Sequence, residues 1–228
     1  MLVSKTSALA ERVRISPPVP NKGVDYMKVL TITYSRTGSH TFSRYLEKNG
    51  FYIIHEPFTN YGHKDINWPQ DKNTLSKDIQ RYNDVMVWDQ FISRSDNRAD
   101  NKTAMEYLEW ISPQVDKIVT LLRKNSFEWA LSSLHLDATG EYFDDWEPRK
   151  KIHVDYQDVV DNMRDHECLN NYLTSFNYPV CYFEDLVEGI EQCPFTMKSM
   201  DKFNIPSKEE YIINYNELKQ KLGDQDKF

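Results

Sequence analysis

The sequence predicts an α/β domain with a mainly parallel central sheet. Short apolar segments rich in β-branched and aromatic residues alternate along the chain with longer segments whose apolar residues recur at helical spacing. This alternation is typical of sheets in which each strand is followed by a helix. The chain has 228 residues, of which 39% are hydrophobic, and this is enough to form the core of one domain.

An N-terminal arm is expected before this domain. Residues 1–26 combine charged residues and Ser with the Pro-containing stretch 16–20, and Pro fixes φ and removes a hydrogen-bond donor. We expect 1–26 to be extended or partly disordered, with a strap packed over the domain as the alternative. Residues 27–228 are then expected to form a single α/β domain.

The first strand, turn and helix are the most clearly marked elements. Residues 28–35 are rich in Val, Ile, Thr and Tyr, which indicates a short buried strand. A turn at Gly38 follows, and a helix with Phe42 and Leu46 on one face then runs to Gly50. The remaining elements are expected in this order: strand 51–54, helix 74–82, strand 84–88, helix 102–111, strand 117–122, helix 125–140 with its caps, helix 154–176, strand 178–183, and helical segments to the end.

Charge and cysteine content limit the classes of function. The chain has 28 Lys and Arg against 35 Asp and Glu, a net charge of −7, which disfavours general nucleic-acid binding because phosphate neutralisation needs a basic surface. No apolar run approaches about 18 residues and no signal-peptide pattern opens the chain, so we expect a cytoplasmic protein with no membrane span. Cys168, Cys181 and Cys193 form no CxxC pair and indicate thiols in a reducing compartment.

One strand–turn–helix stretch, residues 33–41 (TYSRTGSHT), concentrates groups that bind anions. The N–H groups and the positive dipole end of the expected helix point to the turn. The turn and the start of the helix, residues 35–41, carry one guanidinium and four hydroxyls, those of Arg36, Ser35, Thr37, Ser39 and Thr41. The combination suits a phosphate or sulfate group, and the alternative is a structural turn with solvated hydroxyls.

This stretch departs from the loop that binds nucleoside triphosphates. That loop, G-x-x-x-x-G-K-[ST], requires Gly at the position of Thr33 and Lys at the position of Ser39. No Cys stands upstream of Arg36, which disfavours a cysteine phosphatase. A P-loop nucleotide or small-molecule kinase is therefore only the alternative hypothesis.

The stretch resembles the 5′-phosphosulfate loop of sulfotransferases, which use 3′-phosphoadenosine 5′-phosphosulfate (PAPS) as donor. The family pattern is roughly P-[KR]-[ST]-G-[ST]-[ST] directly after the first strand. Four residues match it, namely Arg36, Thr37, Gly38 and Ser39. Ser35 stands in place of the Pro, and His40 stands in place of the second hydroxyl residue, with Thr41 next. The resemblance implies that His40 or Thr41 completes the phosphate-binding shell.

A second segment with anion-binding groups follows the strand 117–122. Arg123 ends this strand, and Ser132 comes nine residues later in "ALS". From the residues alone, a surface ion pair and a hydroxyl bonded to its own helix are the alternatives. The run 123–142 resembles the bacterial trehalose-type sulfotransferases, which implies that Arg123 and Ser132 bind the 3′-phosphate of PAPS.

The resemblance extends in order from residue 28 to residue 187. Its third part is the stretch 183–186, Phe-Glu-Asp-Leu, which is similar to a Y-E-D-L stretch after a late strand of many sulfotransferases. We expect a structural role for it, as a strand end and helix cap. The resemblance implies a three-layer sandwich with a P-loop-nucleotide-hydrolase-like (sulfotransferase) fold.

The second strand ends at His55 and Glu56. We expect this end to be a neighbour of the anion-binding turn, and only one of the two side chains to face it, because consecutive strand residues point to opposite sides. Surface exposure or an ion pair is the alternative. Carbohydrate sulfotransferases have a Glu at this place, so the resemblance implies that Glu56 is the catalytic base, with His55 as second candidate. The basic stretch 148–151 is either a solvated patch or a segment that closes over the anionic donor.

The function expected from these residues and the resemblance is PAPS-dependent sulfate transfer by in-line displacement. The acceptor is a hydroxyl of a carbohydrate or other small molecule, with no nucleic-acid or membrane partner. Arg36 stabilises the charge that develops on the departing phosphate. No metal is expected, since the six His residues show no HExxH spacing. A non-catalytic anion-binding protein with the same fold is the remaining alternative.

Overall fold

Helices and strands alternate along the part of the chain that the computed structural model describes, residues 27–48, 50–55, 72–92, 101–140, 149–188 and 207–222. The expected N-terminal arm lies outside these residues. The strands are β1 (Lys28–Tyr34), β2 (Tyr52–His55), β3 (Val85–Ile92), β4 (Lys117–Leu122) and β5 (Val180–Tyr182). The α-helices are α1 (Ser39–Lys48), α2 (Lys72–Arg81), α3 (Asn101–Ile111), α4 (Ser126–Thr139), α5 (Tyr156–Thr174), α6 (Phe183–Glu188) and α7 (Tyr215–Leu222), and the short 3-10 helices are η1 (Ser112–Gln114) and η2 (Lys208–Glu210).

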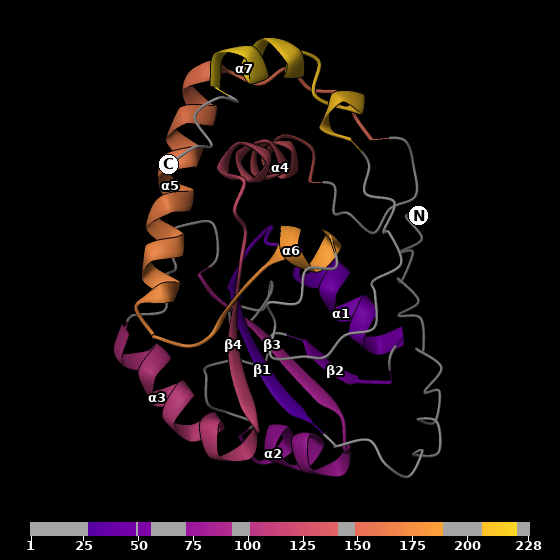
Figure 1. The fold of residues 1–228 in the computed structure, drawn as a ribbon, viewed down its shortest axis with the longest axis vertical. Helices are drawn as coiled ribbons and strands as arrows, with labels where there is room; N and C mark the ends of the chain where they lie inside the picture. Colours follow the sequence, from indigo (N-terminus) through magenta and orange to yellow (C-terminus); the bar gives the residue numbers. More distant parts are fainter. Residues whose placement is uncertain are drawn as a thin grey trace, which may run out of the picture.

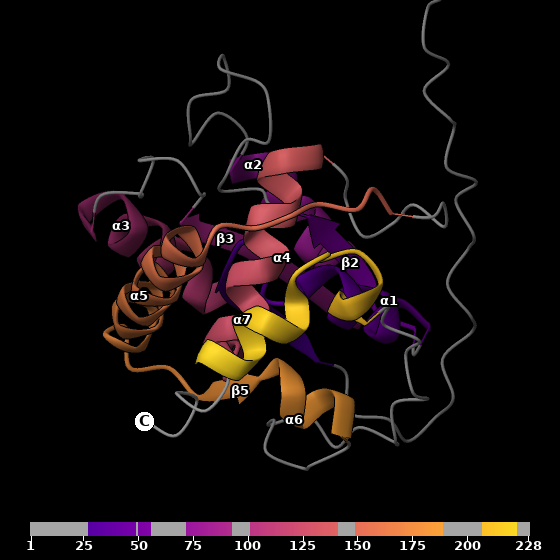
Figure 2. The ribbon, with the colours of Figure 1, turned by 90° about the horizontal axis from the view of Figure 1, so that it is seen from above.

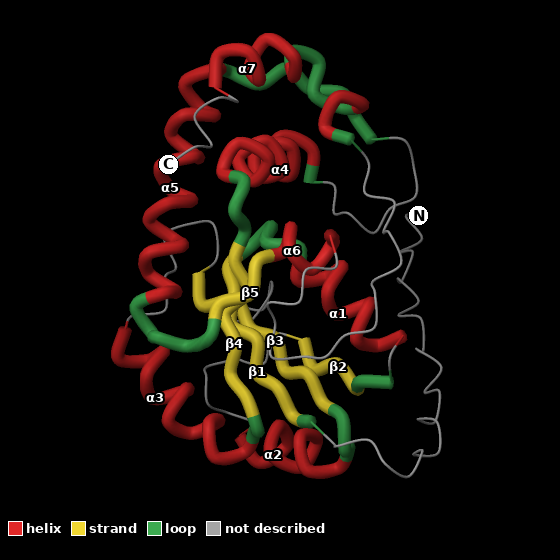
Figure 3. The backbone as a smooth tube through the Cα atoms, in the orientation of Figure 1, coloured by secondary structure: helices red, strands yellow, loops and turns green. Residues whose placement is uncertain are grey.

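The five described strands form one parallel sheet in the order β2-β3-β1-β4-β5, which confirms the predicted α/β class (Figures 1 and 3). The central strand β1 pairs with β3 from Lys28 opposite Val85, and with β4 from Val29 opposite Lys117. Parallel strands need crossover connections that carry helices. The carboxyl ends of all five strands therefore meet at one edge of the sheet.

Both faces of the sheet are covered, because side chains alternate along each strand. Leu30 and Ile32 of β1 pack in one apolar cluster with α2, α3, α4, α5 and α7, whereas Val29 packs in a second cluster with α1 and α6. Seen from above, α3 and α5 lie on one side of the strands and α1 and α6 on the other (Figure 2). This arrangement agrees with a three-layer α/β sandwich.

The neighbouring strands β1 and β4 lead into helices that belong to different clusters. The helix after β1, α1, packs in the cluster of Val29, and the helix after β4, α4, packs in the cluster of Leu30. In open α/β sheets, ligands bind beyond the carboxyl ends of strands where successive connections change sides. The turns after β1 and β4 therefore flank the expected ligand position of this fold.

The C-terminal part of the described chain packs over α4. A parallel bridge joins Ile152 to Ile212, and the amide of Asn214 exchanges two hydrogen bonds with the backbone of Val154. Figure 1 shows α7 beyond α4, at the same end of the sheet as the turn into α4. None of the helices in the described ranges has both the length and the apolar character to cross a membrane.

The expectation that all three cysteines are thiols is wrong. Cys181, in the interior of β5, is disulfide-bonded, while Cys168 on α5 is a free, exposed thiol. Sequence spacing did not show this bond, because a disulfide depends on how the chain folds back in space rather than on a local motif. The reducing compartment inferred from the cysteines therefore loses its support.

Candidate functional site

The turn between β1 and α1 holds a strained conformation. Arg36 and Gly38 both have positive φ, 67° and 91°, and a residue with a side chain adopts this region at a cost of about 1–2 kcal/mol. The hydroxyl of Thr37 donates to the Tyr34 carbonyl over 3.0 Å and contacts the Thr33 hydroxyl. The indole N–H of Trp129, on α4, donates to the Ser35 carbonyl over 2.9 Å. These bonds hold the turn in place and direct the Arg36 side chain toward α4.

Gly38 also brings the turn close to the helix α6. A Cβ atom at this position would lie 2.2 Å from the ring of Phe183, the first residue of α6. Only glycine fits both the left-handed conformation and this close approach. The sequence therefore requires Gly38 for a packing reason as well as for the turn.

The remaining residues of the phosphosulfate-like loop lie in the first turn of α1. Ser39 is buried and its carbonyl accepts a hydrogen bond from the Ser43 hydroxyl, whereas Thr41 is half-buried and His40 is exposed. The first N–H groups of a helix have no partner within the helix. The helix α1 thus presents its positive dipole end at the turn that carries Arg36.

Arg36 and Ser132, from the two predicted anion-binding segments, are in direct contact. The Arg36 Nε and Nη2 atoms donate to the Ser132 hydroxyl over 3.1 and 3.0 Å. Ser132 lies on the buried side of α4, which Asn125 caps at its N-terminus and Gly140 ends in a left-handed conformation. The bend from β4 into α4 therefore brings the hydroxyl of α4 to the turn after β1.

Arg123 follows β4 and lies against the same turn. Its Nη1 atom donates to the Arg36 carbonyl over 3.2 Å, and its side chain is only 12% exposed. The carboxylate of Glu184 lies 3.5 Å from the Arg123 Nε atom, and Phe183 places its ring 5.5 Å from the guanidinium carbon. The two arginines come from separate anion-binding segments of the sequence, and the fold brings both to the same turn.

The helix α6 fixes the turn between β4 and α4. The Glu184 carboxylate accepts hydrogen bonds from the backbone N–H groups of Lys124 and Asn125, and the Lys124 amine pairs with the buried Asp185. The predicted strand end and cap at 183–186 is thus a structural element. Its acidic side chains hold the segment from which Arg123 projects.

Two further residues of this cluster, Lys208 and Tyr211, come from the C-terminal segment and were not predicted. The Lys208 amine and the Arg149 guanidinium carbon lie 5.4 and 4.7 Å from the centre of the Tyr211 ring. Arg149 belongs to the basic stretch 148–151, of which 149–151 are described. No pattern of spacing connects residues so far apart in sequence, so only the folded chain brings them together.

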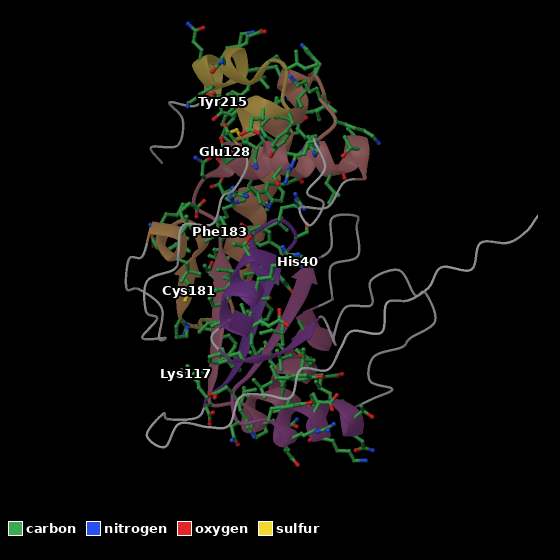
Figure 4. All side chains as sticks on the ribbon, turned by 90° about the vertical axis from the view of Figure 1, so that its right-hand side faces the viewer. His40, Lys117, Glu128, Cys181, Phe183 and Tyr215 are labelled. Carbon is green, nitrogen blue, oxygen red and sulfur yellow. The ribbon has the colours of Figure 1, made fainter. Side chains whose placement is uncertain are left out.

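The ionisation of this cluster reflects its burial. Burial first, and then the positive charge of Arg123, lowers the pKa of the Lys208 amine well below its usual range. Burial raises the pKa of Tyr211 to about 12. Glu128 on α4 is the carboxylate that acts on both groups, and it accepts a hydrogen bond of 2.7 Å from the Tyr215 hydroxyl. Figure 4 shows Glu128 and Tyr215 at the end of the molecule opposite Lys117, where β4 begins.

The end of β2, where the two candidate bases were expected to face the anion-binding turn, is not adjacent to the end of β1. His55 ends β2, and β3 separates β2 from β1 in the sheet. The strand end of β2 is therefore two strand spacings, about 10 Å, from the end of β1, and the expectation of neighbouring ends is wrong. The side chain of His55 and all of Glu56 lie outside the described residues.

His166 of α5 packs behind the turn after β1. Its ring centroid lies 5.8 Å from that of Tyr34 and 5.1 Å from that of Trp129, and its Nε2 atom is buried without a hydrogen-bond partner. Burial first, and then Arg123, lowers the pKa of His166 to about 4. The ring is thus neutral in the folded protein at neutral pH.

This burial predicts a pH-dependent loss of stability. Because the pKa of about 4 in the folded state is below the ordinary value of 6.5, the unfolded chain binds more protons between these values, and stability falls as pH falls through this window. The contribution of His166 is about 3 kcal/mol at full extent. The free energy of unfolding should be measured in urea at a series of pH values. Between about pH 6.5 and 4 it should fall less steeply with falling pH in His166→Phe than in the native chain, by a slope equivalent to up to one proton. Above pH 7 the two pH dependences should be parallel. An unchanged slope below pH 6.5 would contradict the assignment.

No set of three or more His, Cys, Asp and Glu side chains in the described ranges is arranged to hold a metal ion. Comparison of the chain with protein-family models, with curated proteins and with solved structures finds no match. The site is therefore interpreted from its own geometry and from the resemblance of its motifs.

Proposed function

We propose that this protein is a sulfotransferase that moves a sulfuryl group from PAPS to a hydroxyl acceptor of a carbohydrate or other small molecule. The observation that carries the proposal is the contact between Arg36 and Ser132, with Arg123 bonded to the Arg36 carbonyl. The resemblance assigns Arg36 to the 5′-phosphosulfate and the other two to the 3′-phosphate. PAPS carries a 5′-phosphosulfate and a 3′-phosphate in one molecule, and it therefore fits a cluster in which Arg36, Arg123 and Ser132 lie together.

The charge of the cluster supports an anionic ligand. Three guanidinium groups, those of Arg36, Arg123 and Arg149, act electrostatically on the buried Lys208 and Tyr211, and Glu128 is the carboxylate that opposes them there. Buried like charges raise the free energy of the folded protein unless opposite charges compensate them. An anion bound at this position relieves that repulsion. A donor with several negative charges compensates the guanidinium groups better than a single carboxylate does.

The position in the sheet supports the finer fold assignment. The turn after β1 and the turn after β4 lie where the connections change sides, and this is where ligands bind in open α/β sheets. A central first strand that leads through a Gly-containing turn into a helix agrees with the P-loop-like sulfotransferase fold that the resemblance implies. Ser39 in place of the Walker lysine weighs against the kinase alternative.

The proposed reaction is an in-line displacement at sulfur. The acceptor oxygen forms a bond to sulfur as the bond from sulfur to the bridging phosphate oxygen breaks, and adenosine 3′,5′-bisphosphate leaves. Arg36 and the N-terminus of α1 stabilise the negative charge on the departing phosphate. Glu56, or His55 as second candidate, takes the acceptor proton, which typically accelerates such a step by about 10²–10⁴-fold.

Ligand binding tests the proposal most directly. Adenosine 3′,5′-bisphosphate at about 100 times its dissociation constant should stabilise the protein by about 2.7 kcal/mol in a thermal-shift measurement. AMP should stabilise it much less at the same concentration, since it lacks the 3′-phosphate. A larger shift with ATP and Mg²⁺ than with the bisphosphate would favour a kinase. Binding of the bisphosphate without transfer from PAPS to any acceptor would identify a non-catalytic relative.

Arg123→Ala should change nucleotide selectivity rather than remove all binding. The guanidinium is assigned to the 3′-phosphate, so we expect affinity for adenosine 3′,5′-bisphosphate to fall about 10–100-fold while AMP affinity changes little. Calorimetric titration of both nucleotides gives the comparison. Because Glu184 lies 3.5 Å from Arg123, the double variant Arg123→Ala/Glu184→Gln controls for the carboxylate left behind. Equal losses for both nucleotides would overturn the assignment of Arg123.

A further inference from the structure

The segment 208–211 carries two buried groups that the reaction described above does not use. Lys208 is 4% exposed and Tyr211 is 1% exposed. Both residues lie in the part of the chain beyond the motifs that resemble sulfotransferases. Both groups interact electrostatically with Arg36, Arg123 and Arg149.

The Tyr211 hydroxyl is an unpartnered polar group inside this cluster. Its oxygen is buried and makes no hydrogen bond within the described part of the chain. Its ring contacts the Arg149 guanidinium at 4.7 Å and the His135 ring at 4.6 Å, and its electrostatic neighbours include Arg36. A buried hydroxyl without a partner costs about 1–3 kcal/mol. A phosphate or sulfate oxygen at this place accepts the missing hydrogen bond.

Cations from several elements act electrostatically on the Lys208 amine. Arg36 comes from the turn after β1, Arg123 from the turn after β4, and Arg149 from the segment before α5. Glu128 of α4 is the opposing charge that faces it, and the Tyr211 ring lies 5.4 Å away. Burial among three guanidinium groups favours the neutral amine, and a bound dianion reverses that preference.

We propose that Lys208 and Tyr211 complete the anion-binding site, and that a phosphate or sulfate group binds there with proton uptake from solvent by the Lys208 amine. Burial and the neighbouring guanidinium groups disfavour the charged amine, and a bound anion favours it. The Tyr211 hydroxyl donates to the same anion. The proposal rests on the proposed function in one respect, because the same guanidinium groups bind the donor.

Calorimetric titration in two buffers of different ionisation enthalpy measures this proton. The probe is adenosine 3′,5′-bisphosphate at about pH 8, where phosphate monoesters, with a second pKa of about 6, are fully ionised. We expect net proton uptake on binding and an affinity that falls as pH rises. Inorganic sulfate in a parallel titration shows whether the free anion suffices or the nucleotide is required, and uptake with either one supports the assignment.

Lys208→Met keeps the length and apolar stem of the side chain but cannot take up a proton. It should still fold, bind the bisphosphate about tenfold or more weakly, and show proton uptake near zero. Lys219→Met is the matched control, since Lys219 is an exposed lysine 5.4 Å from the Tyr215 ring on the neighbouring α7. The control should retain both the affinity and the proton uptake of the native chain.

Tyr211→Phe separates a binding role from a structural one. Removal of the hydroxyl should leave the empty protein equally stable or more stable, because no hydrogen bond is lost there. The affinity for the bisphosphate should fall about fivefold. A loss of stability without a loss of affinity overturns the role of Tyr211.

The outcomes keep this inference distinct from the proposed function. If the native chain binds the bisphosphate with no net proton uptake, or if uptake persists in Lys208→Met, the role of Lys208 is overturned while the proposed function stands. If the native chain binds neither the nucleotide nor sulfate, both proposals fail.

Discussion

Arg36→Ala should remove sulfate transfer and most of the binding of adenosine 3′,5′-bisphosphate. The guanidinium donates hydrogen bonds to Ser132 through two nitrogens, and the turn that carries Arg36 leads into the N-terminus of α1. Hydrogen bonds to charged groups contribute about 1.5–3 kcal/mol, so we expect affinity to fall about 10–150-fold. Turnover should fall by a further factor of about 10³, the scale on which an arginine stabilises the transition state of a related phosphoryl transfer.

This variant should lose about 1–3 kcal/mol of stability, because Ser132 is buried and loses its two hydrogen bonds from Arg36. Arg36 has a φ of 67°, and Ala is strained there to a similar degree. Arg36→Gly removes the strain and should be more stable than Arg36→Ala while binding the bisphosphate equally poorly. If the loss of binding came only from destabilisation of the turn, Arg36→Gly would bind better than Arg36→Ala.

Two further variants complete this test. Arg36→Lys keeps the charge but not the planar fork, and we expect binding between those of the native chain and Arg36→Ala. Arg164→Ala removes an exposed guanidinium that pairs with Asp161 on the surface of α5, and it should bind the bisphosphate like the native chain. Measured transfer by Arg36→Ala within tenfold of the native rate would contradict the assigned role.

Local patterns predicted the elements, but not the order of the strands. The run of Ile, Val and Leu at 117–122 is found as β4 with the predicted ends, and the helix after it is capped by Asn125 and Gly140. Those signals are local, since they depend on propensity and on caps within a few residues. The insertion of β3 between β1 and β2 depends on long-range pairing. For that reason the end of β2 was expected too close to the anion-binding turn.

The candidate site was predictable where its residues belong to contiguous motifs. The stretch 33–41 and the spacing of Arg123 and Ser132 selected residues that the fold brings into contact. Lys208 and Tyr211 carry no such signal, because their role arises only when the C-terminal segment packs over α4. A buried lysine cannot be recognised from a sequence in which most lysines are exposed.

The packing of Gly38 predicts a large loss of stability from a small substitution. Gly38→Ala introduces a Cβ 2.2 Å from the Phe183 ring at a φ of 91°. The left-handed conformation costs a residue with a Cβ about 1–2 kcal/mol, and insertion of a methyl group into a packed contact costs about 1–3 kcal/mol more. We therefore expect Gly38→Ala to lower the free energy of unfolding by about 2–5 kcal/mol in urea titration.

Gly50 provides a matched control for the backbone term. Its φ is 94°, close to that of Gly38, but a Cβ there meets nothing within 4 Å. Gly50→Ala should therefore cost only the conformational term of about 1–2 kcal/mol and leave binding of the bisphosphate intact. If the two glycine variants lose equal stability, the contact with Phe183 is not the cause.

A double-mutant cycle with Phe183 isolates the contact itself. Phe183→Ala alone removes a buried ring at a cost of about 3–5 kcal/mol, but it also vacates the space that the new methyl group needs. In that background Gly38→Ala should cost no more than Gly50→Ala does in the native chain, which gives a coupling free energy of about 1–3 kcal/mol.

Because Phe183 also lies 5.5 Å from the Arg123 guanidinium, displacement of its ring in Gly38→Ala should weaken the binding of adenosine 3′,5′-bisphosphate more than that of AMP. An equal loss of affinity for both nucleotides would mean that Gly38→Ala disturbs only the turn that carries Arg36 and does not displace Arg123 through α6.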